Sequence, residues 1–264
     1  MAAALLMMNM HGAVMASDCD RTIFRYSEKI PFAIMVDPTS HLEWEDIILR
    51  YQSEQSINTT KSFRSWAEDF AAYLTEIFNS KDQGVRDSES SKKVICVGID
   101  PSAMFPQAVI LTMQPDDYGI KMKYDDIHEI NLQNPVFHLH LGVCPNISIL
   151  FGGMSDDIKG ELVQLCANEL VTVLGGREEA VNLISENYDV FLDSFDKILN
   201  DPQVTSAISD FTIKDMVAMA ENLVDTESLQ HLGSDGHQSS KTCEIGIVTL
   251  AERFKWIKHS LYGA

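Results

Sequence analysis

The sequence predicts an α+β protein in which mainly antiparallel strands pair and amphipathic helices cover them. Three observations lead to this fold class. The chain of 264 residues begins and ends with apolar runs broken by turns, so both ends are expected in strands. Two segments in the first third carry apolar residues at helical spacing. Four short apolar runs between residues 93 and 141, joined by short connections, predict a second sheet.

The first strands are predicted at the very start of the chain. Ala2 to Met8 is uniformly apolar, Asn9 to Gly12 has turn chemistry, and Ala13 to Ser17 is largely apolar again. This pattern predicts a hairpin whose two strands are buried on both faces. A further buried strand is predicted over Pro31 to Val36.

Two amphipathic helices are predicted after these strands. Ser40 and Glu43 have the spacing of a capping box, which would open a helix over Leu42 to Tyr51. Aromatic and aliphatic residues recur at spacings of three and four over Lys61 to Asn79, which predicts a second helix. Residues 80–92 are rich in Asp, Gln, Gly and Ser, and this stretch is predicted to be a mobile loop.

The second half of the chain is predicted to be mostly helical before it returns to strands. Helices are expected over residues 156–174, 178–199 and 213–229, and strands over residues 243–250 and 254–257. Strands at both ends of the chain would pair in a central sheet. We therefore predict a single domain over residues 1–264.

Composition narrows the classes of function. Acidic residues outnumber basic ones by 39 to 20, giving a net charge of −19 without a visible basic patch, so neither nucleic acid nor membrane is an expected partner. The opening apolar run is shorter than a membrane span and lacks the basic flank of a signal peptide. Five cysteines without metal-ligand spacing favour reduced thiols in a cytoplasmic protein.

A metal site is conceivable at a pair of histidines. His138 and His140 alternate on a predicted strand, and a third ligand such as His128 or His11 could complete a site. No Asp or Glu stands at a supporting spacing, so two half-exposed histidines on an edge or interface strand are the simpler interpretation. The Gly-Gly pairs of the second half match neither phosphate-binding loop motif. We predict no metal and no cofactor.

A resemblance to a known family begins in the first hairpin. This chain opens with AAALLMMNMHGAVMASDCDRT, followed by SEKI. The stretch resembles the opening of the proteasome-β-like branch of the N-terminal nucleophile (Ntn) hydrolases, especially its uncharacterised bacterial members. Four later segments of this chain also resemble parts of the family, in the family's order. They are PFAIMVDPTSHLEWEDIILRY, INLQNPVFHLHLGV, ISILFGGMSDDIKGEL and EIGIVTLAERFKWIKHSLY. The resemblance implies a four-layer αββα sandwich with extra helices in the second half.

The resemblance also implies a catalytic frame. In the family the initiator Met is removed, and the exposed residue, usually Thr, is the nucleophile and supplies its own base through its α-amino group. That position is Ala2 in this chain, which has no hydroxyl or thiol. The orienting Asp and the activating Lys of the family match Asp18 and Lys29. The Gly whose N–H serves the oxyanion aligns with Pro38, which has no N–H.

Two departures at separate points favour natural loss of hydrolysis over one engineered change. The leading hypothesis is a catalytically inactive proteasome-β-like protein, a structural or regulatory subunit that assembles with itself or with a related active subunit. Asp18 and Lys29 would then form a buried salt bridge inherited with the fold. One alternative is an active threonine-type amide hydrolase or peptidase, if Ala2 replaces a natural Thr. A second is a stand-alone module that binds a peptide or small molecule in the vestigial cleft.

Overall fold

The computed structural model describes residues 3–19, 21–26, 30–54, 61–100, 102–116, 119–142, 207–235 and 243–258, with residues 144, 147, 150, 151, 164, 165 and 168. The chain divides into two compact units, Met1–Cys144 with Ile208–Ala264, and Pro145–Ala207. The helices predicted over residues 156–174 and 178–199 belong to the second unit and lie almost wholly outside the described residues. The single domain over residues 1–264 stays a prediction, and the fold below is that of the first unit.

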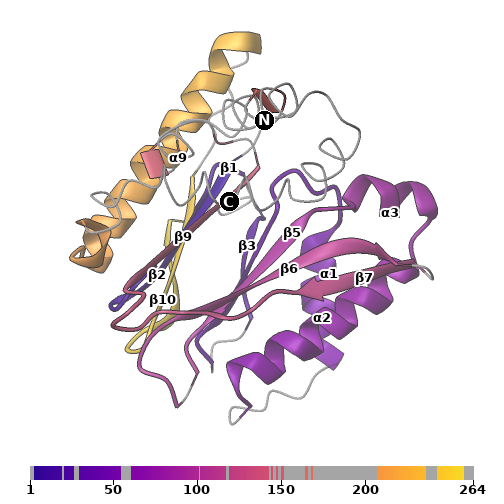
Figure 1. Cartoon of the computed structure of the whole chain (residues 1–264), viewed down its shortest axis with the longest axis horizontal. Helices are drawn as coiled ribbons and strands as arrows, with labels where there is room; N and C mark the ends of the chain where they lie inside the picture. The colour runs from indigo at the N-terminus through magenta and orange to yellow at the C-terminus, as the bar shows by residue number, and fades with distance from the viewer. Residues whose placement is uncertain are drawn as a thin grey trace, which may run out of the picture. The chain divides into compact units, whose positions relative to one another are not determined.

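Two antiparallel sheets form the centre of this unit (Figure 1). One sheet has five strands in the order β11-β10-β2-β1-β9, and the other has β3-β4-β5-β6-β7 with β8 paired to β6. The first sheet contains β1 (Ala3–Asn9), β2 (Gly12–Ser17), β9 (Val136–Gly142), β10 (Glu244–Thr249) and β11 (Arg253–Lys258). The second contains β3 (Ile23–Arg25), β4 (Phe32–Val36), β5 (Lys93–Gly98), β6 (Gln107–Asp116), β7 (Gly119–Tyr124) and β8 (His128–Glu129).

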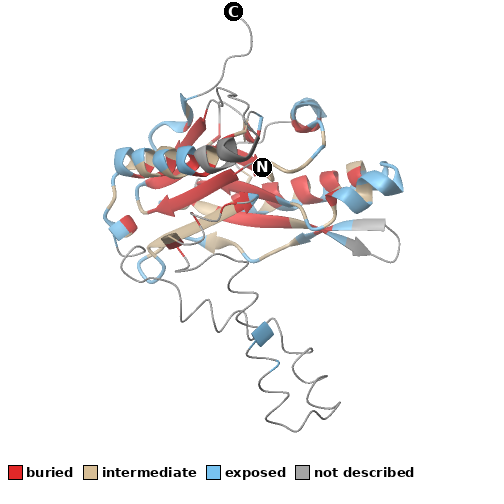
Figure 2. Cartoon of the chain, turned by 90° about the horizontal axis from the view of Figure 1, so that it is seen from above, coloured by how far each residue is buried: buried red, intermediate tan, exposed pale blue. Residues whose placement is uncertain are grey.

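The opening hairpin is confirmed. β1 and β2 pair with Asn9 opposite Gly12, and every residue of the two strands is buried. Ala4, Leu6 and Met8 join one hydrophobic cluster with residues of the six-stranded sheet, and both strands also contact the helix α9 (Ile213–Asp235). Figure 2 shows the buried residues gathered in the strands and on one side of the helices. Covering on both faces explains why the two runs are apolar at nearly every position.

One strand lies in a different sheet from the prediction. The sequence predicts four strands between residues 93 and 141 in one sheet, but β9 pairs with β1, with Leu6 opposite Leu139. β1 is an interior strand, so the N–H and C=O groups along both of its edges need hydrogen-bond partners. β2 pairs with one edge and β9 pairs with the other. Short connections in the sequence do not reveal that the chain crosses from one sheet to the other at this point.

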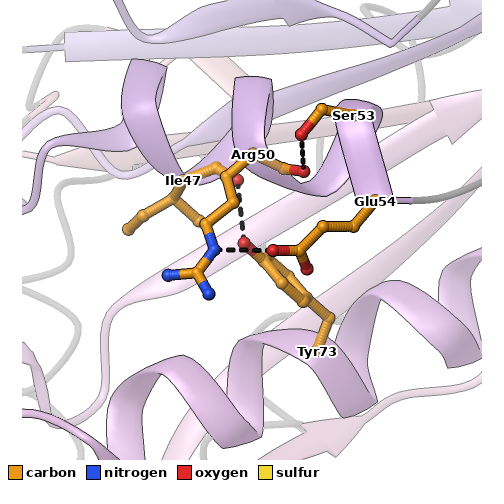
Figure 3. Close-up of polar contacts among 5 residues, drawn as sticks. All are labelled: Ile47, Arg50, Ser53, Glu54 and Tyr73. Carbon is orange, nitrogen blue, oxygen red and sulfur yellow. Dashed lines mark hydrogen bonds and ion pairs between the residues drawn. The ribbon is translucent and has the colours of Figure 1, made fainter.

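Two helices cover the six-stranded sheet. The apolar faces of α1 (Trp44–Glu54) and α2 (Phe63–Asn79) form one cluster with side chains of β4, β5 and β6. Figure 3 shows how α1 lies on α2, where the Tyr73 hydroxyl donates a hydrogen bond to the Ile47 carbonyl oxygen at 3.3 Å. Beside it the exposed Arg50 donates to the Glu54 carboxylate at 2.7 Å. Both predicted helices are thus confirmed, with α1 displaced by a few residues.

The displacement of α1 has a cause in the stretch 80–92, which contains a short helix, α3 (Gln83–Glu89), where the sequence predicts a loop. The side chain of Glu89 is fully buried. Its carboxylate accepts hydrogen bonds from the Ser40 hydroxyl at 2.6 Å and from the His41 backbone N–H at 2.9 Å. The Ser40 hydroxyl is therefore engaged by Glu89 instead of opening a capping box, and α1 begins at Trp44.

The helix α9 confirms the last predicted helix and extends it to Asp235. Its fully buried residues are Met216, Ala220, Val224 and Glu227, and it lies against β1 and β2 (Figure 1). The carboxylate of Asp215 accepts hydrogen bonds from the Thr212 hydroxyl and backbone N–H at 2.7 and 2.9 Å. These bonds satisfy donors at the start of the helix. Among the described residues, no helix is both long enough and apolar enough to span a membrane.

His128 connects the two sheets at their margin. Its ring stacks on Phe137 of β9 with the ring centroids 4.3 Å apart, while β8, which carries His128, pairs with β6 of the other sheet. Burial lowers the pKa of His128 below its ordinary value of 6.5, and the nearby Asp125 and Asp126 oppose this shift. The folded protein therefore favours the neutral ring at this position.

We expect acid to weaken the folded state through His128. A histidine whose pKa is lower in the folded than in the unfolded chain contributes stability above its ordinary pKa and loses it as the pH falls. In urea unfolding between about pH 7.5 and 5.5, the His128→Gln variant should lose less stability on acidification than the unchanged protein. Equal losses in the two proteins would show that His128 does not contribute.

Candidate functional site

Asp18 is buried at the end of β2, beside the start of β1, with 3% of its surface exposed. Its Oδ1 accepts a hydrogen bond from the Ala3 backbone N–H at 2.7 Å, and its own N–H donates to the Ala3 carbonyl oxygen at 3.1 Å. Its Oδ2 accepts from the hydroxyl of Ser228 on α9 at 3.0 Å. Both carboxylate oxygens are therefore engaged, one by the first strand and one by the last long helix.

The backbone of Ala3 is also held by Ser17, the last residue of β2. The Ser17 hydroxyl donates to the Ala3 carbonyl oxygen at 3.2 Å and accepts from the Cys19 backbone N–H at 3.1 Å. This arrangement fixes the first described residue against the end of the hairpin. Ala2 and Lys29, the other two predicted site residues, lie outside the described residues, so only Asp18 has a described geometry.

Ser228 is a site residue that the sequence interpretation missed. Ser228 is half-buried. It stands four residues after Val224, on the side of α9 where Met216, Ala220 and Val224 are buried. Residues four apart share one face of a helix. A hydroxyl that continues an apolar stripe was the available signal, because such a group needs a polar partner when it is covered.

Asn9 fixes the chain just before α9. Its side chain is fully buried, and its Nδ2 donates to the carbonyl oxygens of Ile208 at 3.0 Å and Phe211 at 2.8 Å. Its Oδ1 accepts from the His11 backbone N–H at 2.9 Å. The segment before α9 is thus fastened to the turn end of β1, and Ser228 fastens the helix to Asp18 near the other end of the hairpin.

Cys243 lies near Asp18 but does not supply a nucleophile. Burial raises the pKa of its thiol to about 12; the carboxylates of Asp225, Glu221 and Asp18 add to the shift and Lys258 opposes it. Lys258 itself donates a hydrogen bond to the Glu221 carboxylate at 2.9 Å. The reactive form of cysteine is the thiolate, so this thiol is inert at neutral pH.

A pocket of about 250 Å³ lies between the turn that joins β2 to β3 and the loop that leads from β4 into α1. The described residues that line it are Cys19, Arg21, Thr22, Val36, Asp37, Pro38, Ser40, Leu42, Glu43, Trp44 and Glu45. The lining includes Pro38, which the sequence resemblance aligns approximately with the family's oxyanion Gly. Cys19, the residue after Asp18 in the sequence, also lines the pocket.

The loop that forms one wall of this pocket is held by several hydrogen bonds. The Asp37 carboxylate accepts from the Thr39 backbone N–H at 2.9 Å and from its hydroxyl at 2.6 Å, which closes a local turn. The ammonium group of Lys92 contacts the Thr39 hydroxyl. The Trp44 indole N–H donates to the Ser40 hydroxyl oxygen at 2.8 Å. With Glu89 bound to Ser40, the loop is tied to both α1 and α3.

The histidine pair lies on β9, where His138 is opposite Met7 and His140 opposite Leu5 in β1. Both are half-buried on the strand that ends the described order of the five-stranded sheet. This placement agrees with the simpler interpretation of the pair. Within the described part of the chain, no three His, Cys, Asp or Glu side chains are grouped so that they could hold a metal ion.

Comparisons with known proteins show a structural likeness but no family. No protein-family model matches the chain, and no curated protein matches it. Among solved structures the chain is similar to Anbu (ancestral beta-subunit) from Yersinia bercovieri, with 12% sequence identity and a TM-score of 0.46. The likeness covers 98% of this chain and 88% of that chain. The mixed α and β architecture with antiparallel sheets stands on the strand pairs described above.

Proposed function

We propose that this protein is a catalytically inactive member of the proteasome-β-like Ntn hydrolases that acts as a structural or regulatory subunit of an oligomer. The observation that carries the proposal is the buried Asp18 carboxylate, which is bound by the Ala3 N–H and the Ser228 hydroxyl. In this proposal Asp18 takes the role of the family's orienting acid, and it is bonded to Ala3, the residue that follows the nucleophile position. That position is Ala2, whose methyl group has no reactive atom.

The order of the layers supports the family assignment in this proposal. α1 and α2 lie on one sheet, the two sheets share a hydrophobic cluster, and α9 lies on the other sheet. The αββα sandwich that the sequence resemblance implies has the same order. We propose this sandwich for the first unit, with Lys29 in the place of the family's activating Lys.

Two further features favour inactivity. Pro38 has no N–H for an oxyanion, and the loss of one such donor typically costs about 100- to 1,000-fold in rate. The protonated thiol of Cys243 offers no substitute for the missing hydroxyl. The missing nucleophile and the missing N–H donor are independent losses. Restoring the nucleophile alone should therefore still leave hydrolysis slow, because the oxyanion donor remains absent.

We expect the unchanged protein not to hydrolyse fluorogenic peptide amides. Ala2→Thr, with removal of Met1 verified by intact mass, should gain at most weak hydrolysis. Ala2→Thr combined with Pro38→Gly should be about 100-fold faster than Ala2→Thr alone, because a backbone donor becomes available. Asp18→Asn in the double variant is the control and should abolish the gain. Strong hydrolysis by Ala2→Thr alone, lost again when Asp18→Asn is added, would contradict the proposal and support the active hydrolase.

The oligomeric part of the proposal is tested by size-exclusion chromatography with light scattering. A subunit that assembles with itself should elute as a multimer of defined stoichiometry at micromolar concentration. A strict monomer that also fails to join any active relative would contradict the role of a subunit.

The pocket favours a second candidate function, a module that binds a peptide or small molecule. Its wall is fixed by the hydrogen bonds that Ser40 donates to Glu89 and Trp44 donates to Ser40, so the space of about 250 Å³ is formed without a ligand. Preformed concave sites of this kind are where small ligands usually bind. This function needs no nucleophile at Ala2.

A further inference from the structure

We infer that the pocket between the β2–β3 turn and the β4–α1 loop binds a cationic group on an apolar stem, as in the side chain of a lysine or arginine of a peptide. This inference rests on the second candidate function, that the pocket binds a ligand, and adds the chemical class of that ligand. It stands apart from the question of catalysis at Ala2.

The wall of the pocket suits an aliphatic stem. Trp44, Leu42, Val36 and Pro38 contribute apolar surface, and the Trp44 side chain is only 4% exposed. Its indole N–H is held by Ser40, while its ring packs edge-on against Phe78 with the centroids 6.2 Å apart.

The charge of the pocket selects the sign of the ligand. Three carboxylates line it, from Asp37, Glu43 and Glu45, against the single guanidinium of Arg21, so the described lining carries a formal charge of −3 + 1 = −2. Arg21 is paired with Glu45 at 3.2 Å, and both side chains are about half exposed. With a net charge of −19 on the whole chain, the surrounding field also attracts cations and repels anions.

The acidic side chains belong to two consecutive elements that line the pocket, the β4–α1 loop and the first turn of α1. Glu45 lies in the first turn of α1, and Asp37 lies in the loop that its own contacts with Thr39 close. Arg21 comes from the β2–β3 turn, where it has a φ of 61°. A ligand ammonium in this space would compete with Arg21 for Glu45, so removing Arg21 should strengthen binding of a cation.

The experiment titrates the full chain with three capped amino acids, N-acetyl methylamides of lysine, norleucine and glutamate. Lysine and norleucine share an aliphatic stem and differ in the ammonium group. Binding is followed by the indole N–H signals in NMR spectra, since the protein has three tryptophans and the Trp44 signal is identified by its loss in Trp44→Phe. We expect the lysine probe to shift the Trp44 signal and to bind more tightly than the other two.

Variants test the source of the preference. Glu43→Gln should weaken the lysine probe by about two- to fivefold, as expected for one exposed charge pair, and Arg21→Gln should strengthen it by a similar factor. Glu54→Gln is the matched control: it removes the same charge from the far end of α1, an 11-residue helix about 16 Å long. At physiological salt its effect should be screened, because the Debye length is about 8 Å.

Two results would overturn the inference, and they separate it from the function on which it rests. If norleucine or glutamate binds as tightly as lysine, the pocket binds ligands but the assigned charge class is wrong. If no probe shifts the Trp44 signal, the pocket is not a binding site for such side chains, and the second candidate function fails with the inference.

Discussion

Replacing Asn9 with alanine is expected to lower the free energy of unfolding by about 3 kcal/mol, because it removes three hydrogen bonds of about 1 kcal/mol each from a buried site. The Asn9 amide donates to the carbonyl oxygens of Ile208 and Phe211, and its Oδ1 accepts from the His11 N–H. The side chain is fully buried, so water cannot take over these bonds without opening the fold.

Urea unfolding followed by circular dichroism measures this loss. Asn131→Ala is the matched control, since the Asn131 side chain also makes three hydrogen bonds, but at an exposed turn. Its Oδ1 accepts from the Gln133 and Asn134 N–H groups, and its Nδ2 donates to the Glu129 carbonyl oxygen at 3.3 Å. Its cost should stay below about 1 kcal/mol. Equal losses in the two variants would show that burial at Asn9 is not the cause.

The second large effect is expected at Glu89. Glu89→Ala should lower the free energy of unfolding by about 3 to 6 kcal/mol, because hydrogen bonds to a charged group contribute about 1.5 to 3 kcal/mol each and two are lost. It should also change the NMR signal of the Trp44 indole, since Ser40 links Glu89 to Trp44. Glu89→Gln keeps the shape and should cost less than Glu89→Ala.

Asp87→Ala provides the control for Glu89. Asp87 is an exposed acid on the same short helix, so its replacement changes the charge of α3 equally and should alter stability by less than about 0.5 kcal/mol. An unchanged Trp44 signal in Glu89→Ala would contradict the connection from α3 to the pocket wall.

Most elements of the first unit follow from the pattern of apolar residues, and the exceptions have physical causes. The runs in β1, β2, β4 and β5 are buried on both faces, so their apolar character is a strong signal. The sheet to which β9 belongs depends on its pairing with β1, about 130 residues earlier, and such pairing leaves no local trace in the sequence.

The site is less predictable than the fold. Asp18 was predicted because its position resembles a family motif, whereas Ser228 and Asn9 act through hydrogen bonds between distant segments. Glu89 lies in a stretch whose polar composition predicts a loop, and one buried carboxylate changes its structure. Composition averages over a segment, so it cannot identify the one polar residue that the fold buries.

The pairing of the first hairpin has a consequence for how the protein folds. β2 pairs with β10, with Ser17 opposite Glu244, and β1 lies between β2 and β9. β1 and β2 are therefore synthesised well before their sheet neighbours β9 and β10, and the sheet around them is complete only when β10 has been made. Contacts between such distant residues slow folding and leave apolar strands uncovered in the meantime. The environment of Asp18 joins Ala3 to Ser228, which lie far apart in the sequence, so we expect it to form late in folding.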